Sequence, residues 1–451
     1  MFQMTLSVLA LLCCLPPALS AQSITAIVHG QIIDGNGGPP IPDGVVLIQN
    51  DRIIGVGAAR AIAVPRNARI IDATQKTILP GLADLHVHLM GGWDGEAMDM
   101  LGYQRYLDAL LYAGVTTVFD LGNSLPFIQQ IAQEVKTGRI PGPTVHMAGS
   151  LIDGPDPLFP SLSFVVSSIA EIPGDIRQLK RAHVDVVKGY ANLSEPALRA
   201  VVEAAAAESL RVFVDMGDAN GTAPIAQTGI AAFAHARKHS PITNETLSIM
   251  RAQHVATITT LAGDEAHSRR RLADLNFLRD PLLQRSMPPR FVAELTAFAT
   301  RPLSPEDSIQ TSQALSRLRI AMANVKLLFD AGVLLVAGTD APLPGVYYGE
   351  GLHRELELMV EAGLTPLQAI TTATRNAALL LNELEEWGTL EPGKRADILI
   401  VRGNPAQRIG DTRKIEFVIQ AGRVLNRKLF EFDSAKSPDF RTSSSVMDDS
   451  R

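Results

Sequence analysis

Two histidines, His86 and His88, are the residues of this chain whose type and spacing most directly suggest chemistry. They end the apolar run of residues 78–88, which reads Ile-Leu-Pro-Gly-Leu-Ala-Asp-Leu-His-Val-His. Side chains two positions apart on a β-strand point to the same face of the sheet. Both imidazoles can therefore reach one metal ion, and imidazole binds zinc, copper, iron and nickel. An isolated His-x-His pair is a weak signal, so the rest of the chain must supply further ligands.

Residue types that bind metal ions or protons also end four later apolar runs, and these residues are Lys188, Asp215, His235 and Asp340. Each alone has an ordinary explanation: a lysine that reaches solvent, a histidine in the core or an aspartate that caps a helix. Their shared position at the ends of runs is much harder to explain in that way. We therefore interpret them, together with His86 and His88, as one site.

Eight apolar, β-branched runs alternate with helical patterns through the middle of the chain, at residues 82–88, 115–120, 144–148, 184–188, 212–215, 231–235, 255–260 and 333–339. Helical sequences such as residues 195–209 and 316–331 separate most of them. Eight strands with intervening helices predict an α/β fold, a parallel (β/α)8 TIM barrel. Active sites of such barrels lie at the C-terminal ends of the strands, where the candidate residues stand.

Both ends of the chain differ in sequence pattern from the middle, because they contain short β-rich runs separated by turns. Residues 21–80 and 383–432 are therefore predicted to form a composite β-sandwich domain beside the barrel, which we place at residues 81–382. The long connection at residues 263–315 is expected to be a lid-like insertion, with an outer helical buttress as the alternative. Residues 433–451 are expected to be disordered.

The overall composition suits a globular protein that acts on small molecules. Its 451 residues are 46% hydrophobic and 20% charged, which allows a large core and argues against global disorder. With a net charge of −6 and no long basic block, the chain is not expected to bind nucleic acid. We expect a small-molecule substrate and leave a homo-oligomer open.

Residues 1–20 are expected to be a cleavable secretory signal peptide. Their apolar core, residues 6–15, is too short to span a bilayer, and Ala18-Leu19-Ser20 fits a cleavage site after Ser20. The segment has no Lys or Arg, so a buried N-terminal segment is the alternative. A periplasmic or secreted protein without a membrane anchor is expected, and it would contain no cysteine because Cys13 and Cys14 lie in the leader.

Three longer segments of the chain resemble the amidohydrolase superfamily, in particular its imidazolonepropionase and prolidase-like members. They are residues 78–88, residues 331–340 (Ala-Gly-Val-Leu-Leu-Val-Ala-Gly-Thr-Asp) and residues 387–398 (Trp-Gly-Thr-Leu-Glu-Pro-Gly-Lys-Arg-Ala-Asp-Ile). Residues 352–366 also match the usual region of the eighth helix. The resemblance covers nearly all of the mature chain and implies a barrel enzyme that hydrolyses C–N bonds with a metal-bridging hydroxide.

The resemblance also implies roles for individual residues. His86 and His88 match ligands of a first divalent metal ion, and Asp340 completes that site and moves the proton from the hydroxide to the leaving nitrogen. Lys188 matches a lysine that carries CO2 as a carbamate and bridges two ions, and His235 matches a ligand of the second ion. The implied metal is zinc, with manganese or iron as alternatives.

Asp215 is the position at which the chain departs from the family pattern. The family has Val-x-Val-His-x-His at the fifth strand, and residues 212–217 read Val-Phe-Val-Asp-Met-Gly. Carboxylates bind zinc and also harder ions such as manganese, so Asp215 is a candidate ligand of the second ion. Alternatively, the second site is degraded. We therefore expect an amide hydrolase for dipeptides, N-acyl amino acids or cyclic amides, with two alternatives: a lactone or ester hydrolase, and a catalytically impaired binding protein.

Overall fold

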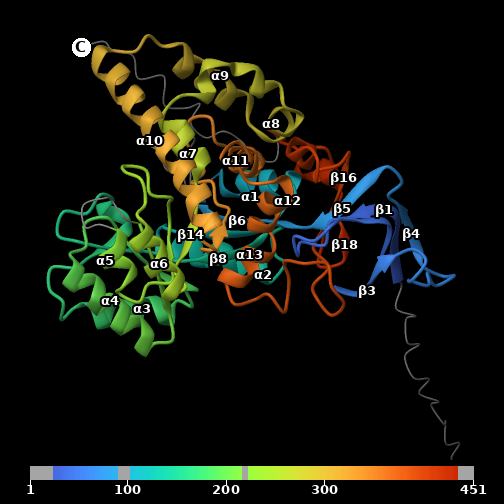
Figure 1. The fold of residues 1–451 in the computed structure, drawn as a ribbon, viewed down its shortest axis with the longest axis horizontal. Coiled ribbons are helices and arrows are strands. Elements are labelled where there is room, and N and C mark those ends of the chain that lie inside the picture. The colour runs from blue at the N-terminus through green and yellow to red at the C-terminus, as the bar shows by residue number, and fades with distance from the viewer. Residues whose placement is uncertain (1–23, 90–101, 216–221, 435–451) are drawn as a thin grey trace, which may run out of the picture.

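The computed structural model describes residues 24–89, 102–215 and 222–434 of the chain (Figure 1). The predicted signal peptide and residues 435–451 of the predicted disordered tail lie outside these ranges, so both remain predictions. Within the described residues, no helix is both long enough and apolar enough to cross a bilayer.

The predicted (β/α)8 barrel is confirmed, and its eight parallel strands are β6 (Leu82–Val87), β7 (Val115–Asp120), β8 (Thr144–Met147), β11 (Val186–Gly189), β12 (Arg211–Val214), β13 (Ala232–Phe233), β14 (Ala256–Ile258) and β15 (Leu335–Val336). They fall into a three-stranded sheet and a longer sheet that also holds β9 (Leu151–Asp153) and β10 (Ser163–Val165). Backbone hydrogen bonds close the ring, from Leu85 N to Ala337 O at 3.0 Å and from Asp185 N to Met147 O at 2.9 Å.

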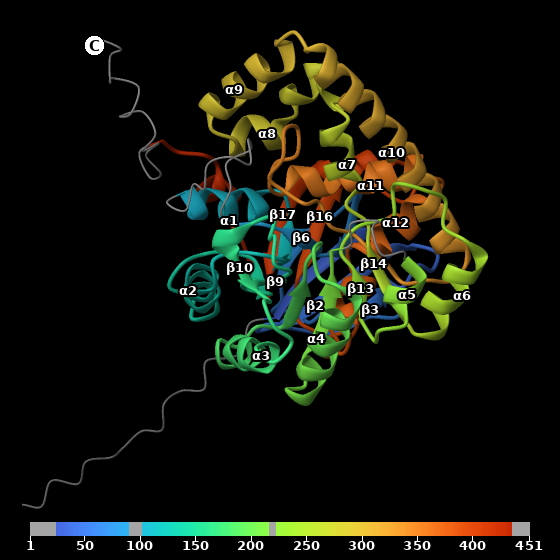
Figure 2. The same cartoon turned by 90° about the vertical axis from the view of Figure 1, so that its left-hand side faces the viewer.

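Helices surround the barrel strands (Figure 2). They are α1 (Tyr103–Tyr112), α2 (Leu125–Lys136), α3 (Ile172–Arg181), α4 (Glu195–Ala207), α5 (Thr222–Ala226), α6 (Asn244–Ala252), α11 (Glu350–Glu361), α12 (Pro366–Thr372) and α13 (Arg375–Leu380). Inward side chains such as Leu85, Phe119 and Phe213 fill the barrel and pack with Trp387. The barrel is therefore a packed core, and function is confined to its rim.

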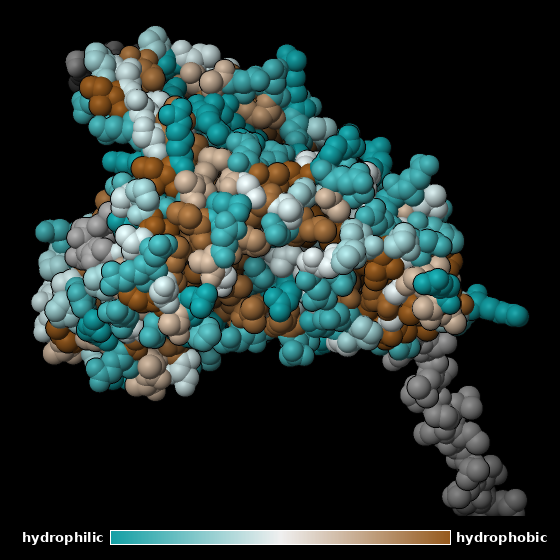
Figure 3. All heavy atoms as spheres, viewed as in Figure 1, coloured by the Kyte–Doolittle hydropathy of each residue, from teal (hydrophilic) through white to brown (hydrophobic). Residues whose placement is uncertain are grey.

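The expected insertion is helical in the structure, with α7 (Leu261–His267), α8 (Pro281–Ser286), α9 (Pro289–Thr300) and the long helix α10 (Pro305–Asp330). The sequence predicted a helix only over residues 316–331. The helix begins earlier because Ser304 and Asp307 form a capping box, in which each side chain accepts the backbone N–H of the other. Helices α9 and α10 form an arm that stands out from the rest of the molecule, with hydrophilic and hydrophobic residues mixed on its surface (Figure 3).

Both ends of the chain contribute to one eight-stranded sheet, formed by β1 (Ile24–Ile32), β2 (Ile41–Gln49), β3 (Arg52–Ala58), β4 (Arg69–Asp72), β5 (Lys76–Pro80), β16 (Ile398–Arg402), β17 (Ile415–Gln420) and β18 (Arg423–Val424). Strand β1 pairs with β4 through its first half and with β5 through its last residues. Because the sheet branches there, Ile27 and Ile48 pack with Ile398 and Ile400 in one apolar cluster. This is the expected composite β domain, seen beside the barrel in Figure 1.

Short 3-10 helices complete the described structure at Pro160–Leu162, Arg271–Ala273, Leu275–Arg279, Ile409–Arg413 and Arg427–Phe430. The second of them follows α7 and starts the path into the arm. The two short helices at residues 409–413 and 427–430 extend the C-terminal part of the sheet toward α11 and α1.

Candidate metal centre

The six residues predicted from the sequence lie at the C-terminal ends of five barrel strands. His86 is in β6 and His88 directly follows it, Lys188 is in β11, and Asp215, His235 and Asp340 follow β12, β13 and β15. Parallel strands end at the same rim of a barrel, which is why runs far apart in the sequence meet here.

Three of these residues form a compact group that could hold a metal ion. One ligand atom from each of His86, His88 and Asp340 lies within 4.8 Å of the others. Asp340 Oδ1 is 3.4 Å from His86 Nε2 and 3.2 Å from His88 Nε2. Two ligands bound about 2.1 Å from one ion at a tetrahedral angle lie about 3.4 Å apart. The two distances from Asp340 therefore match those of ligands that share one divalent ion.

The orientation of the histidine rings also fits a metal centre. His86 Nδ1 lies 2.9 Å from Ala234 O, and His88 Nδ1 lies 2.8 Å from Gly122 O. A carbonyl oxygen can only accept, so each Nδ1 carries a proton and donates it. The Nε2 lone pairs are then left for an ion, an arrangement in which the second partner fixes the tautomer of a ligand histidine.

The other three predicted residues form a second group next to the first. His235 Nε2 is 3.1 Å from Asp215 Oδ2, while its Nδ1 lies 2.7 Å from Thr260 Oγ1. Lys188 Nζ is 3.9 Å from the same Asp215 oxygen, and its side chain is only 1% exposed. The rings of His86 and His235 are 4.8 Å apart between centroids, which joins the two groups into one site. Asp215, at the position where the family pattern has histidine, thus points into the site.

A buried aspartate behind the site fixes the turn that presents Asp340. Asp84 accepts a hydrogen bond from Thr339 Oγ1 at 2.7 Å and another from Thr339 N at 3.0 Å. Asp340 N donates to His86 O at 2.8 Å, and its backbone has a φ of 62°. Asp and Asn tolerate this left-handed conformation better than most residues. The local backbone therefore favours an aspartate at position 340 for a reason independent of its carboxylate.

Burial and mutual charge set the ionisation of His86, His88 and Asp340 in the first group and of Asp215 in the second. Burial alone would raise the pKa of Asp340, but the charge of His86 and the hydrogen bond from His88 hold it well below its usual range. Burial lowers the pKa of His86. Burial also acts to lower the pKa of His88, but the hydrogen bond and charge of Asp340, together with the charge of Asp120, raise it overall. Similarly, the charges of His235 and Lys188 outweigh burial and lower the pKa of Asp215. Asp340 and Asp215 are thus held as carboxylates, the form that binds metal ions.

Burial favours the neutral form of Lys188, the lysine of the second group. It lowers the pKa of Lys188, although the carboxylates of Asp215 and Asp340 counteract the effect. A desolvated lysine loses its proton more easily than one in water.

The structure brings three further residues to the site, Tyr190, Lys238 and His267, and none of them is predicted from the sequence as a ligand. Burial and the Asp215 carboxylate raise the pKa of the Tyr190 phenol, and the Lys188 ammonium lies 5.8 Å from the centre of the Tyr190 ring. Lys238 Nζ forms an ion pair with Asp264 Oδ1 at 2.8 Å. His267 and Lys238 both lie close enough to Asp340 for its charge to affect their pKa values. A usable signal existed for Lys238, which follows the strand-end His235 by three residues.

Three consecutive arginines, Arg269–Arg271, follow helix α7. Arg271 is largely buried and pairs with Glu350 at 2.6 Å, while Arg270 pairs with Glu265 at 2.6 Å. These two arginines therefore tie the start of the insertion to α7 and α11, because Glu265 lies on α7 and Glu350 on α11.

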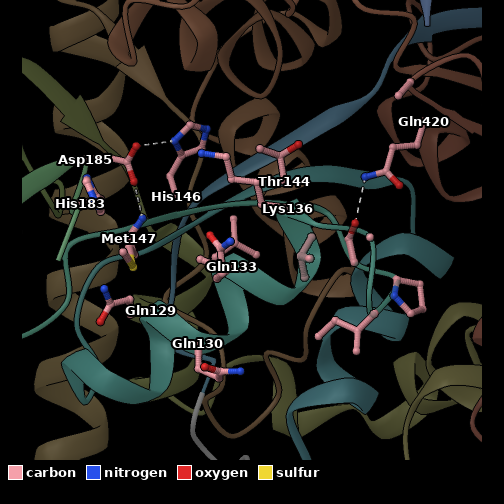
Figure 4. A pocket seen from close by; sticks show the side chains of 18 of the residues that line it. Gln129, Gln130, Gln133, Lys136, Thr144, His146, Met147, His183, Asp185 and Gln420 are labelled. Atoms are coloured by element: carbon pink, nitrogen blue, oxygen red, sulfur yellow. Dashed lines mark hydrogen bonds and ion pairs between the residues drawn. The ribbon is translucent and has the colours of Figure 1, made fainter. Parts of the chain in front are cut away.

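His146 lies away from the metal centre, beside a separate cavity of about 1140 Å³ (Figure 4). Its Nδ1 is 3.1 Å from Asp185 Oδ1, and Asp185 Oδ2 accepts the backbone N–H of Met147 at 2.8 Å. These contacts join β8 to β11, where the two sheets of the barrel meet. His146 therefore serves the closure of the barrel.

Comparison with known proteins identifies relatives over most of the chain. A model described as the amidohydrolase family matches residues 77–432. An imidazolonepropionase of Alkaliphilus metalliredigens is 24% identical over 80% of this chain and 84% of its own length. An ochratoxinase of Aspergillus niger is 23% identical over 86% of this chain and 82% of its own. A solved structure of a Xaa-Pro dipeptidase with methionine in its active site superposes with a TM-score of 0.73, at 22% identity, over 89% of this chain and 100% of that one.

Proposed function

This chain belongs to the amidohydrolase family, and from that premise we propose that it hydrolyses the amide C–N bond of dipeptides, N-acyl amino acids or cyclic amides with bound metal ions. The observation that carries the proposal is the orientation of three histidines. In each, Nδ1 faces an oxygen of the protein while Nε2 faces an aspartate of the rim. His86 and His88 thus direct their Nε2 lone pairs, and Asp340 and Asp215 their carboxylates, toward one space that His235 Nε2 also faces.

The residues divide into two sets that would hold two divalent ions. His86, His88 and Asp340 would hold the first ion. His235 and Asp215 would hold the second, and Lys188, 3.9 Å from Asp215, would carry CO2 as a carbamate that adds a further carboxylate ligand. Zinc suits the histidines, whereas the carboxylate of Asp215 also suits manganese or iron.

The chemistry needs a nucleophile and a proton carrier in addition to binding. Bound divalent ions acidify water and polarise a substrate carbonyl. Asp340 is ionised and lies at the centre of the rim, so its carboxylate can accept a proton from the attacking water and pass it to the leaving nitrogen. Tyr190 lies beside Asp215 and Lys188 and can donate its phenolic hydrogen to the substrate carbonyl oxygen.

The carbamate on Lys188 can be tested separately from turnover. Protein incubated with 13C-labelled bicarbonate and metal should show one carbamate carbon signal in NMR spectra. The Lys188→Ala variant should lose this signal, bind less metal and recover part of its activity with short carboxylic acids. Absence of the signal from active wild-type protein would contradict the carbamate.

Metal content and a substrate panel test the function itself. About two metal ions per chain, with turnover of N-acyl amino acids, dipeptides or cyclic amides, would support the proposal. Turnover of lactones or esters alone would favour the ester hydrolase. Protein that holds close to no metal and hydrolyses neither amides nor esters would be a binding protein. The observation that favours this alternative is that Asp215 stands where the family pattern has histidine.

A further inference from the structure

A second cavity of the molecule lies between the metal centre and the helical arm. Its volume is about 620 Å³, and it is lined by the end of α7, the end of α9 and the first half of α10. Lys238 and His267 form its side toward the barrel rim, while Phe298, Arg301 and Arg317 belong to the arm. The arm therefore supplies a wall that the barrel alone would lack.

The cavity adjoins the proposed catalytic carboxylate through helix α7. A Cβ atom placed on Gly263 would lie 3.2 Å from Asp340 Cβ, so the first turn of α7 packs directly on Asp340. His267 ends the same helix four residues later, which is about 6 Å along the helix axis. Asp340 and the cavity thus contact opposite ends of one short helix, which places the cavity within reach of a substrate bound at Asp340.

The lining of this cavity is strongly cationic. Four basic side chains line it, Lys238, Arg269, Arg301 and Arg317, against the single lining carboxylate of Asp307. The buried Asp264 neutralises Lys238 at 2.8 Å, and Arg269 is engaged by stacking on Phe298 with 4.3 Å to the ring centre. The charge that remains available is that of the other two arginines.

Arg301 and Arg317 are the most exposed arginines of the cavity lining. Arg301 is 61% exposed and lies 3.8 Å from Asp307, a distance typical of a weak surface pair. Arg317 is exposed on α10, and no described residue forms an ion pair with it. Phe298 and Leu303 give the same cavity an apolar surface.

We propose that this cavity is the subsite for a substrate carboxylate and that Arg301 and Arg317 determine specificity for it. Guanidinium groups bind carboxylates through paired, charge-assisted hydrogen bonds, and the apolar surface suits an aromatic or aliphatic side chain next to the carboxylate. The inference rests on the proposed function and narrows its substrate to N-acyl amino acids with a free carboxylate and an apolar side chain.

Two substrates that differ only in the carboxylate test the inference. N-acetyl-L-phenylalanine has it, and N-acetyl-2-phenylethylamine lacks it while keeping the same single amide bond. Wild type should favour the acid. Arg301→Gln and Arg317→Gln should each lower kcat/KM for the acid about fivefold, through KM, and leave the neutral amide unchanged. Arg319→Gln is the matched control, because it is an exposed arginine of α10 outside the cavity lining.

Binding distinguishes failure of the inference from failure of the proposed function. Calorimetry with metal-loaded protein measures the affinity for both compounds whether or not they are hydrolysed. Tighter binding of the acid, reduced by the two cavity variants and by added salt, supports the subsite even if turnover is absent. Equal affinity for the two compounds, or an equal loss in the Arg319→Gln control, would overturn it while amide hydrolysis could still stand.

Discussion

The surroundings of Asp340 fix both its charge and its backbone conformation. It faces two histidines, its pKa is held low, and its backbone is left-handed. Asp340→Asn keeps that backbone favourable but removes the charge, so we expect turnover to fall about 10²- to 10⁴-fold with little change in the melting temperature of the metal-free protein. Steady-state kinetics and circular dichroism measure the two effects. The exposed Asp330→Asn variant is the control, and retention of a tenth of the activity in Asp340→Asn would contradict the assignment.

Asp215 decides whether the site holds one ion or two. Its carboxylate lies 3.1 Å from His235 Nε2, where a ligand of a second ion would lie. We expect Asp215→Ala to bind about one metal ion fewer per chain. Asp215→His should bind zinc more tightly than wild type, because imidazole suits zinc better than harder ions. Elemental analysis and competition with a chelator give both quantities. Two ions and unchanged activity in Asp215→Ala would exclude Asp215 as a ligand.

At the scale of elements, a buried carboxyl joins α7 to α11 beside the site. Glu355 accepts hydrogen bonds from Thr259 Oγ1 at 2.5 Å and from Ala262 N at 2.6 Å. Burial raises its pKa to about 8, above the 4.5 of an exposed glutamate. The native state therefore keeps a proton that the unfolded chain releases, so this contribution to stability is complete below pH 4.5 and is lost as the pH rises to about 8.

Replacement of Glu355 by a neutral amide should remove that pH dependence. Glu355→Gln should gain stability relative to wild type between pH 5 and pH 9, on the order of 2 kcal/mol, because Gln cannot ionise. Urea unfolding midpoints at pH 5, 7 and 9 measure the difference. The exposed Glu385→Gln variant should show no such trend. A constant difference between Glu355→Gln and wild type at all three values would show that Glu355 is not protonated in the native state.

At the scale of the whole molecule, the proposed metal ligands come from five of the eight barrel strands. Ions bound there would join β6 and β15 to β11, β12 and β13. Binding to the native state alone stabilises it by about 4 kcal/mol per site when free metal is 1,000-fold above Kd. We expect chelation to lower the melting temperature by several degrees and metal to restore it. Scanning calorimetry measures the shift, which should shrink in His88→Ala. Identical melting of treated and untreated wild type would argue against tightly bound metal.

The sequence by itself determined the barrel, the β domain drawn from both ends and the six residues at the rim. These features depend on local patterns: apolar runs of strand length, helical periodicity between them, and ligand residue types where each run stops. Parallel strands of a barrel end at the same rim, so the six residues could be placed together in advance, and the family resemblance implied the grouping of residues 86, 88 and 340.

Only the tertiary structure decided which atoms face one another. The Nδ1 partners of His86 and His88 are backbone carbonyls 148 and 34 residues away, which no local pattern encodes. The contacts of the arginines could not be read from the sequence either. Arg270 and Arg271 form internal ion pairs, while Arg317 lines the cavity beside the site. Side-chain direction and long-range contact are set by packing between distant segments, so residue type alone could place the ligands at the rim but could not orient them.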